Sequence, residues 1–268
     1  YPNVINEDGV DTICSGEADE AFSEFIDVYE KGGDYTKVKN FWVKTPNGII
    51  KNEKRPLNQN LDTIPFPDRE MFDDYEEIGL AKVHSFIASR GCPFKCTYCF
   101  NDGMSKSYEG QKYVRRRSVD NVIEEIKRVK EKYDMKIAIF EDDTFNLSKK
   151  WLKEFCEKFS KLGIKLLPIG VRAELIDEEQ IIWLKNANCV SLVFGLESGN
   201  EKIRREVLFR NITDEQMIEC SRLLRKHGIR YATENILAIP TSTIEDDMES
   251  LALNIKCKPL YGGAKLMQ

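Results

Sequence analysis

The feature that most constrains the fold is a strict alternation of short apolar runs and amphipathic helical patterns from residue 81 onward. Strands are expected at residues 83–89, 136–140, 164–171, 190–194 and 231–239. Helices are expected at residues 119–132, 149–162, 178–186 and 201–207. Two more are expected, one from a cap at 213 to residue 227 and one from a cap at 242 to about residue 257. Consecutive strands joined through helices run parallel, because the crossover returns the chain to the same end of the sheet. The pattern therefore predicts an α/β fold with a parallel sheet, either doubly wound or a barrel.

Side chains that can cap a helix precede three of these helices. In a capping box, a side chain accepts a hydrogen bond from the backbone N–H three residues later, and the side chain there bonds back. The pairs that fit are Asp177 with Gln180, Thr213 with Gln216, and Ser242 with Glu245. These pairs predict where the three helices begin.

Residues 1–80 have a different pattern and are expected to form a separate part of the chain. The expected elements are a strand at 10–14, an amphipathic helix at 16–31, and a hairpin of two strands at 41–44 and 49–51. The dipeptide Asn47-Gly48 is the strongest short signal for that hairpin. A proline-bearing stretch ending at 64–69 favours an extended connector. We place the boundary between the two parts near residue 80.

The net charge of -5 argues against a dedicated nucleic-acid binder, because neutralising phosphates requires an excess of Lys and Arg on one face. The one basic run, Arg115-Arg116-Arg117, is typical of a solvated loop. No apolar run approaches the roughly 18–20 residues of a membrane span, and no signal peptide opens the chain. Since the chain also begins without Met, we expect a piece of a longer cytoplasmic polypeptide that does not contact a membrane.

Three of the eight cysteines, Cys92, Cys96 and Cys99, are crowded on the loop after the first expected strand of the alternating series. A structural zinc site usually takes four ligands in two paired knuckles, and the sequence has no second C-x2-C pair. Iron–sulfur clusters normally take four thiolates, so three local thiolates would leave one iron open to an external ligand. This spacing favours metal or redox chemistry in a reducing cytoplasm over disulfides. The dispersed cysteines are expected to be small buried residues: Cys14, Cys156, Cys189, Cys220 and Cys257.

The C-x3-C-x2-C spacing of Cys92, Cys96 and Cys99, at the start of a strand–helix series, resembles the defining motif of the radical S-adenosylmethionine (SAM) superfamily. The resemblance implies a partial parallel (β/α)6 barrel, similar to a TIM barrel, at residues 81–268. It also implies a [4Fe-4S] cluster on the three cysteines, with the amino and carboxylate groups of SAM on the fourth iron. A reductant of the flavodoxin or ferredoxin type would supply one electron. The 5′-deoxyadenosyl radical released from SAM would then take a hydrogen atom from a substrate that the sequence does not identify.

The resemblance further assigns polar residues near the expected strand ends to SAM. Tyr98 resembles the aromatic residue that packs near adenine, although an aromatic residue can also simply fill the loop. Asp142 and Asp143 correspond to the acidic segment that holds the SAM ammonium group. The alternative for these acids is a turn in front of the next helix, since carboxylates stabilise helix N-termini.

Two later strand ends carry further candidates. Arg172 is expected either to pair with the SAM carboxylate or to form a salt bridge with Asp142 or Glu174. A G-x-E-S-G segment resembles the one that contacts the SAM ribose, with Glu197 and Ser198 as the hydrogen-bonding residues. Ligands of parallel α/β folds bind at the carboxyl ends of the strands, which is where these residues are expected.

The first 80 residues resemble the end of a cobalamin-binding domain and its linker in the B12-dependent branch of the superfamily. The resemblance rests on the segment that begins Gly16-Glu17-Ala18, on the Asn47-Gly48 hairpin, and on the stretch at 64–69. It implies that residues 1–80 are a remnant of a Rossmann-like domain and that the full-length protein uses cobalamin. These residues lack the Asp-x-His cobalamin motif, so we expect this chain to bind cobalamin poorly. Members of the branch often transfer a methyl group to an unreactive carbon.

Three alternatives to a B12-dependent methyltransferase stay open. Within the superfamily they are a cyclase or rearrangement enzyme and a methylthiotransferase-like enzyme. The latter usually has a separate N-terminal cysteine domain and a C-terminal RNA-binding module. The third alternative is not an enzyme: it is a non-catalytic iron–sulfur or zinc module that serves as an electron carrier or scaffold.

Overall fold

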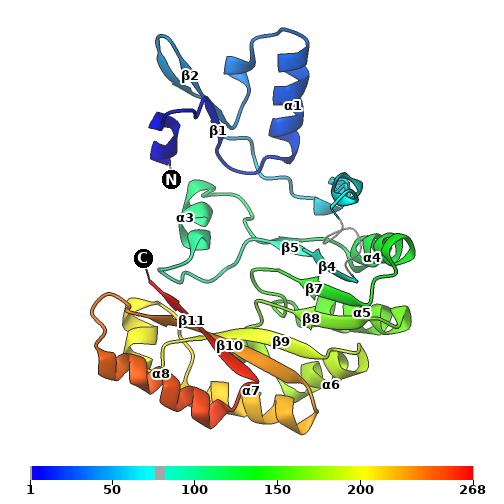
Figure 1. The fold of residues 1–268 in the computed structure, drawn as a ribbon, viewed down its shortest axis with the longest axis vertical. Helices are drawn as coiled ribbons and strands as arrows, with labels where there is room; N and C mark the ends of the chain where they lie inside the picture. The colour runs from blue at the N-terminus through cyan, green and yellow to red at the C-terminus, as the bar shows by residue number, and fades with distance from the viewer. Residues whose placement is uncertain (1, 76–81, 268) are drawn as a thin grey trace. The chain divides into compact units, whose positions relative to one another are not determined.

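The computed structural model describes residues 2–75 and 82–267, and the chain divides into two compact units (Figure 1). The first unit comprises Tyr1–Gln59 with Met104–Tyr113, and the second comprises Asn60–Gly103 with Val114–Gln268. The boundary predicted near residue 80 falls within 76–81, outside the described residues.

The first unit contains a small antiparallel sheet and one long helix. Its strands are β1 (Thr12–Cys14), β2 (Phe41–Thr45) and β3 (Gly48–Lys51), in the order β1-β2-β3, and its helix is α1 (Asp19–Glu30). Thr45 pairs with Gly48, so the hairpin turn is Pro46-Asn47. Phe25 of α1 stacks on Phe41 of β2 with ring centroids 4.3 Å apart. The predicted strand, helix and hairpin are therefore present, with the first two shorter than expected.

The second unit is built on two three-stranded parallel ladders. The strands of the first are β4 (Val83–Phe86), β7 (Ile137–Phe140) and β8 (Lys165–Pro168), and those of the second are β9 (Ser191–Glu197), β10 (Arg230–Leu237) and β11 (Tyr261–Leu266). Parallel bridges between Leu166 and Cys189 and between Val171 and Phe194 join β8 to β9. The order is thus β4-β7-β8-β9-β10-β11, following the chain. Among the described strands β4 and β11 do not pair, so the predicted partial parallel barrel is confirmed as an open one.

Helices follow the strands and pack against one another in chain order. They are α4 (Val119–Tyr133), α5 (Lys149–Phe159), α6 (Glu178–Asn186), α7 (Asp214–Lys226) and α8 (Ile244–Cys257), each in contact with the next (Figure 1). Their inner faces and the strands bury the main apolar core, in which Phe140, Phe145 and Phe155 contact one another. No described helix is both long and apolar enough to span a bilayer.

Two of the three predicted capping boxes are confirmed, those of Asp177 with Gln180 and Thr213 with Gln216. The third is wrong by one residue, because the box that forms joins Thr243 and Asp246. The backbone N–H of Ser242 bonds instead to the carbonyl of Ile239 at 2.8 Å, which places Ser242 in the turn before α8.

Other differences from the predicted elements have local causes. The expected strand at 83–89 is interrupted after Phe86, and β5 (Ser89–Arg90) pairs antiparallel with β6 (Arg115–Arg116). The expected helix at 201–207 contains a π-helical segment, Ile203–Val207, in which the N–H of Leu208 bonds to the carbonyl of Ile203 at 3.0 Å. The strand β11 and the helix α3 (Phe100–Ser107), which follows the cysteine loop, were not predicted.

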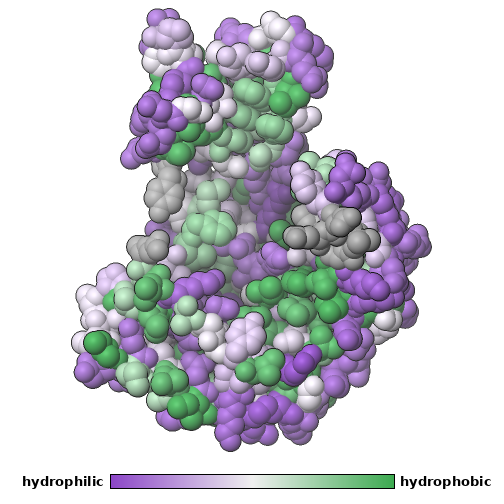
Figure 2. Space-filling view, viewed as in Figure 1, coloured by the Kyte–Doolittle hydropathy of each residue, from purple (hydrophilic) through white to green (hydrophobic). Residues whose placement is uncertain are grey.

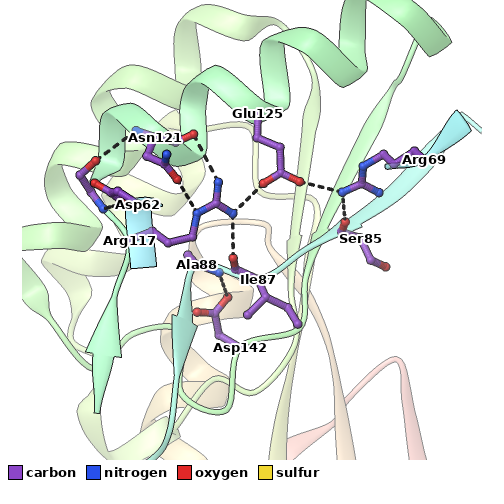
Figure 3. Close-up of polar contacts among 10 residues, drawn as sticks. Asp62, Arg69, Ser85, Ile87, Ala88, Arg117, Asn121, Glu125 and Asp142 are labelled. Carbon is purple, nitrogen blue, oxygen red and sulfur yellow. Dashed lines mark hydrogen bonds and ion pairs between the residues drawn. The ribbon is translucent and has the colours of Figure 1, made fainter. Parts of the chain in front are cut away.

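The basic run at 115–117 was expected to be a solvated loop. That prediction is wrong. Arg115 is buried, and the guanidinium of Arg116 lies 4.6 Å from the Trp151 ring centroid. Nη1 of Arg117 bonds to buried Glu125 of α4 at 2.6 Å (Figure 3). The other oxygen of Glu125 accepts from Arg69 at 2.9 Å, so one carboxylate ties two segments to α4 (Figure 3).

Apolar residues also face outward on α8. Ile244, Met248, Leu251 and Ile255 recur at helical spacing and are all more than half exposed. The space-filling view shows hydrophobic surface over this lower part of the second unit (Figure 2). The helix is therefore apolar on its outer face as well as on the face that packs against the sheet.

Candidate functional site

The three clustered cysteines lie on the loop between β5 and α3, and backbone contacts fix this loop near its centre. The N–H of Cys99 bonds to the carbonyl of Cys96 at 3.1 Å, which forms a tight turn. The backbone N–H and the hydroxyl of Thr97 donate to the carbonyls of Leu208 and Val207, at 3.2 and 2.7 Å. The loop is thus held against the π-helical segment that follows β9.

Each of the three sulfur atoms has a polar neighbour. The Sγ of Cys92 lies 3.3 Å from Oγ1 of Thr144, and Nη1 of Arg172 lies 3.7 Å from Sγ of Cys96. Nδ2 of Asn101 lies 3.6 Å from Sγ of Cys99. Burial raises the pKa of the Cys92 thiol, whereas the Thr144 hydroxyl and Arg172 oppose that rise. Arg172 and Asn101 donate to the sulfur atoms of Cys96 and Cys99, and such donors favour the thiolate, which is the form that binds metal.

The cysteines share one cavity of about 160 Å³ with residues from the carboxyl ends of β7, β8 and β9. Its lining consists of Cys92, Phe94, Cys96, Tyr98, Cys99, Asn101, Asp143, Gly170, Val171, Arg172, Gly195, Glu197 and Arg210. This is the edge of a parallel sheet at which ligands bind in such folds.

The adjacent acids Asp142 and Asp143 have different environments. Asp143 lines the cavity, and its carboxylate accepts from the N–H of Gly91 at 3.1 Å and from Asn101 at 2.9 Å. Asp142 is not among the lining residues: it is buried, and it accepts from the N–H of Ala88 at 3.1 Å and from the Ser89 hydroxyl. Burial raises the pKa of the Asp142 carboxyl. Asp142 thus holds the chain just before the cysteine loop, and only Asp143 reaches the cavity.

Arg172 makes the salt bridge to Glu174 that was one of its expected alternatives. Its Nε donates to Oε1 of Glu174 at 2.6 Å, and both side chains are less than a tenth exposed. The guanidinium carbon also lies 3.6 Å from the centroid of the Phe94 ring, while Nη1 approaches Cys96. Contacts with Glu174, Phe94 and Cys96 therefore orient the Arg172 side chain where it lines the cavity.

The adjacent residues Glu197 and Ser198 also have different environments. Glu197 lines the cavity with Tyr98, and a hydrogen bond links their side chains. Burial, and after it the charge of Glu197, raises the pKa of the Tyr98 hydroxyl. Ser198 is buried away from the lining residues, and its Oγ accepts from the N–H of Asn200 at 3.2 Å. Ser198 therefore stabilises the turn after β9.

Sequence reasoning missed several residues of this site. Asn101 follows Cys99 by two positions, so its closeness to the motif was the available signal. Phe94 lies inside the motif itself. Arg210 is an isolated basic residue between two helical segments, and the sequence holds no signal that would bring it to the cavity.

The residues present fit an iron–sulfur cluster with a polar ligand beside it. In the described part of the chain, no three His, Cys, Asp or Glu side chains converge on a single ion. A [4Fe-4S] cluster does not need such convergence, because each thiolate binds a different iron. Nε of Arg210 and Oε2 of Glu174 are buried without a partner among the described residues. Such atoms usually meet a ligand or water, and of these two residues Arg210 lines the cavity whereas Glu174 does not.

The comparison with protein families gives the decisive observation. The model of the radical SAM superfamily matches residues 86–253, which begin at the last residue of β4 and include the cysteine loop and β5 to β10. The chain belongs to the radical SAM superfamily. It is therefore an enzyme of a family that uses SAM and a [4Fe-4S] cluster.

Two curated relatives resemble this radical SAM chain over most of its length. One is named an uncharacterized methyltransferase of Pyrococcus horikoshii, 31% identical over 88% of this chain and 51% of the relative. The other is named a putative methylthiotransferase of Methanocaldococcus jannaschii, 27% identical over 92% of this chain and 53% of the relative. The chain thus spans about half the length of both.

A solved radical SAM structure shares the fold. The radical SAM methyltransferase TsrM from Kitasatospora setae, with tryptophan and a SAM analogue bound, superposes with a TM-score of 0.78 at 16% identity. The match covers 98% of this chain and 52% of TsrM. A second TsrM structure, with cobalamin and a [4Fe-4S] cluster bound, gives a TM-score of 0.77 at 14% identity. At these identities the likeness shows the fold alone.

Proposed function

We propose that Cys92, Cys96 and Cys99 bind a [4Fe-4S] cluster and that SAM occupies the cavity beside them. The observation that carries this proposal is that the three thiols line one cavity with Asp143, Arg172 and Glu197. This combination supplies sulfur ligands next to groups that bind an ammonium, a carboxylate and hydroxyls.

The roles of the chain's own residues follow from their chemistry. When bound, the cluster would supply the sulfonium of SAM with one electron taken from an external reductant, and the S–C5′ bond would break to give methionine and a 5′-deoxyadenosyl radical. Asp143 accepts hydrogen bonds from the SAM ammonium group, and Arg172 donates to its carboxylate. Glu197 accepts from ribose hydroxyls, and Tyr98 packs near the adenine. Asp142 and Ser198 support these groups through the backbone segments that they hold.

In the full-length protein we propose a cobalamin-dependent transfer of a methyl group to an unreactive carbon. One relative carries the name methyltransferase, and the fold is similar to that of a methyltransferase solved with cobalamin. Residues 1–80 would then be the remnant of a Rossmann-like cobalamin domain that precedes the barrel. Full-length protein purified with added cobalamin should retain it through gel filtration, whereas residues 1–268 should lose it.

A second candidate is a methylthiotransferase-like activity. It is favoured by the Methanocaldococcus jannaschii relative, which carries that name and matches 92% of this chain. The two activities differ in the group attached to the substrate, since methylthio transfer adds a sulfur atom. Mass spectrometry of products from full-length protein supplied with isotope-labelled SAM distinguishes them.

Anaerobic reconstitution with iron and sulfide tests the SAM chemistry of this chain. We expect four irons per chain as in a [4Fe-4S] cluster, an electron paramagnetic resonance spectrum that changes when SAM is added, and release of 5′-deoxyadenosine and methionine under dithionite. An electron carrier would leave SAM intact, and a spectrum indifferent to SAM would contradict the proposal.

A matched pair of cysteine variants tests the ligands. Cys96→Ala should lose iron, because it removes one of three thiolates. Cys156→Ala should retain iron, because Cys156 lies in the apolar core on α5. Equal loss of iron in both variants would contradict the three-ligand assignment.

A further inference from the structure

Arg210 reaches the cavity from the segment between the π-helical turn and α7. It is 5% exposed, and its Nη2 donates to the carbonyl of Gly195 at 2.7 Å. Nη1 lies 3.8 Å from Oε1 of Glu197. The backbone N–H of Arg210 bonds to the carbonyl of Arg204 at 2.8 Å. The guanidinium of this lining residue is therefore held next to the Glu197 carboxylate.

Glu197 has an unusual backbone and a folded-back side chain. Its φ is +69°, in the left-handed region that few non-glycine residues adopt. Its carboxylate lies above Gly195, where an added Cβ would come within 1.9 Å of Oε1. Opposite these residues the register of β10 shifts between Glu234 and Asn235. A bulge of this kind re-aims a side chain, here the carboxylate at the end of β9.

A carboxylate in this position requires a cation. Burial raises the pKa of Glu197, and Arg210 is the strongest influence that opposes the rise, followed by the hydrogen bond from Tyr98. A buried charge left without its partner is costly, so the direction of the Glu197 side chain depends on where the guanidinium lies. The hydrogen bond from Arg210 to the carbonyl of Gly195 fixes the position of the guanidinium.

We propose that Arg210 is a positioning residue that holds the Glu197 carboxylate, folded over Gly195, in the direction in which it binds SAM. This inference rests on the proposed function of the site, and it adds a residue that acts through Glu197. Nη2 of Arg210 donates to Gly195, and Nη1 lies within ion-pair distance of Glu197, so the contribution that we propose for Arg210 passes through the carboxylate.

A double-mutant cycle on SAM affinity tests this role. The probe is SAM itself, measured by equilibrium dialysis against the anaerobically reconstituted chain, with iron content determined in each variant. Arg210→Met keeps an unbranched, though shorter, side chain and removes the charge, and it should raise the dissociation constant for SAM at least about tenfold. Arg210→Lys should recover part of that loss. In a Glu197→Gln background, Arg210→Met should change the constant by less than about twofold, because the residue it acts through is already neutral.

Gly195→Ala provides an independent perturbation of the same carboxylate. Its Cβ would overlap Oε1 of Glu197, the far end of a flexible side chain, so the carboxylate must move while Arg210 and the net charge stay unchanged. We expect weaker SAM binding with normal iron content. If Arg210→Met does not fold, Gly195→Ala tests the position of the carboxylate instead, and Arg210→Lys replaces Arg210→Met in the double-mutant cycle.

Arg117→Met is the matched control. Arg117 is also a largely buried arginine paired with a buried carboxylate, Glu125, but it does not line the cavity (Figure 3). It should lower stability and leave the dissociation constant for SAM unchanged.

The outcomes separate the inference from the proposed function. An unchanged constant in Arg210→Met, or full additivity with Glu197→Gln, overturns the positioning role while SAM binding by the unmodified chain stands. Failure of the unmodified reconstituted chain to bind SAM overturns the proposed function and the inference with it.

Discussion

The guanidinium carbon of Arg172 lies 3.6 Å from the centroid of the Phe94 ring. Phe94 belongs to the cysteine loop, and Arg172 follows β8, so the contact joins the loop to the strand end. The same guanidinium neutralises Glu174. One cation therefore ties together the loop, the strand end and a buried carboxylate.

Arg172→Met should destabilise the apoprotein strongly, because it leaves the buried carboxylate of Glu174 without its cation. We expect a loss of about 3–5 kcal/mol in the free energy of unfolding, measured by urea denaturation. Arg222→Met is the control, since its pair with Glu219 is half exposed and surface ion pairs contribute little to stability. Similar losses in both variants would contradict the prediction.

Gly170→Ala should cost more stability than Gly163→Ala. Both glycines have left-handed φ angles, +73° and +67°, so each substitution carries a backbone strain of about 1–2 kcal/mol. At Gly170 the new Cβ would also lie 2.2 Å from the carbonyl oxygen of Asp142, whereas at Gly163 it meets no atom within 4 Å. The added overlap should cost roughly a further 1–3 kcal/mol. Thermal unfolding measures the difference, and equal melting temperatures would argue against it.

Thr241→Gly should stabilise the protein. Thr241 has a φ of +76°, which strains a β-branched residue, and glycine relieves that strain. Relief of about 1–2 kcal/mol outweighs the roughly 0.5–1 kcal/mol that glycine's backbone entropy costs, so we expect a gain of up to about 1.5 kcal/mol. Thr243→Gly, two residues later, removes the cap of α8 and should be slightly destabilising. Denaturant midpoints of the two variants should therefore move in opposite directions.

Stability should fall in acid partly through Glu178. Hydrogen bonds from Lys226 and His227 lower its pKa to about 2 in the folded state, from 4.5. The folded state binds the proton less tightly than the unfolded state. The contribution is therefore present above about pH 4.5 and is lost as the pH falls toward 2.

Glu178→Gln isolates this contribution. The difference in urea midpoint between the unmodified chain and the variant should shrink as the pH is lowered from 6 to 3. Because the pair is exposed, 0.5 M salt should reduce the difference at pH 6 as well. A difference independent of pH would exclude the ion pair as its source.

The local elements of this chain could be predicted because their causes are local. Alternating apolar runs and helical periodicity depend on residues a few positions apart, and so do the capping boxes at Asp177 and Thr213. Prediction missed β11, whose Gly262 and Gly263 carry no apolar signal; this strand forms because its backbone pairs with β10. The π-helical turn at 203–207 was also missed, because no sequence pattern indicates that backbone hydrogen bonds will join residues five apart instead of four.

For the site, the sequence by itself determined the cysteine motif and its place after the first strand of a parallel series, since both depend on spacing along the chain. Only the tertiary structure decided which neighbouring side chains face the cavity. In that structure Asp143 and Glu197 line the cavity, whereas their neighbours Asp142 and Ser198 do not. It also places Arg210 in hydrogen-bond contact with Gly195, fifteen residues earlier in the chain. The physical reason is that the direction of a side chain at a strand end depends on bulges and on partners from other strands, which spacing along one segment does not encode.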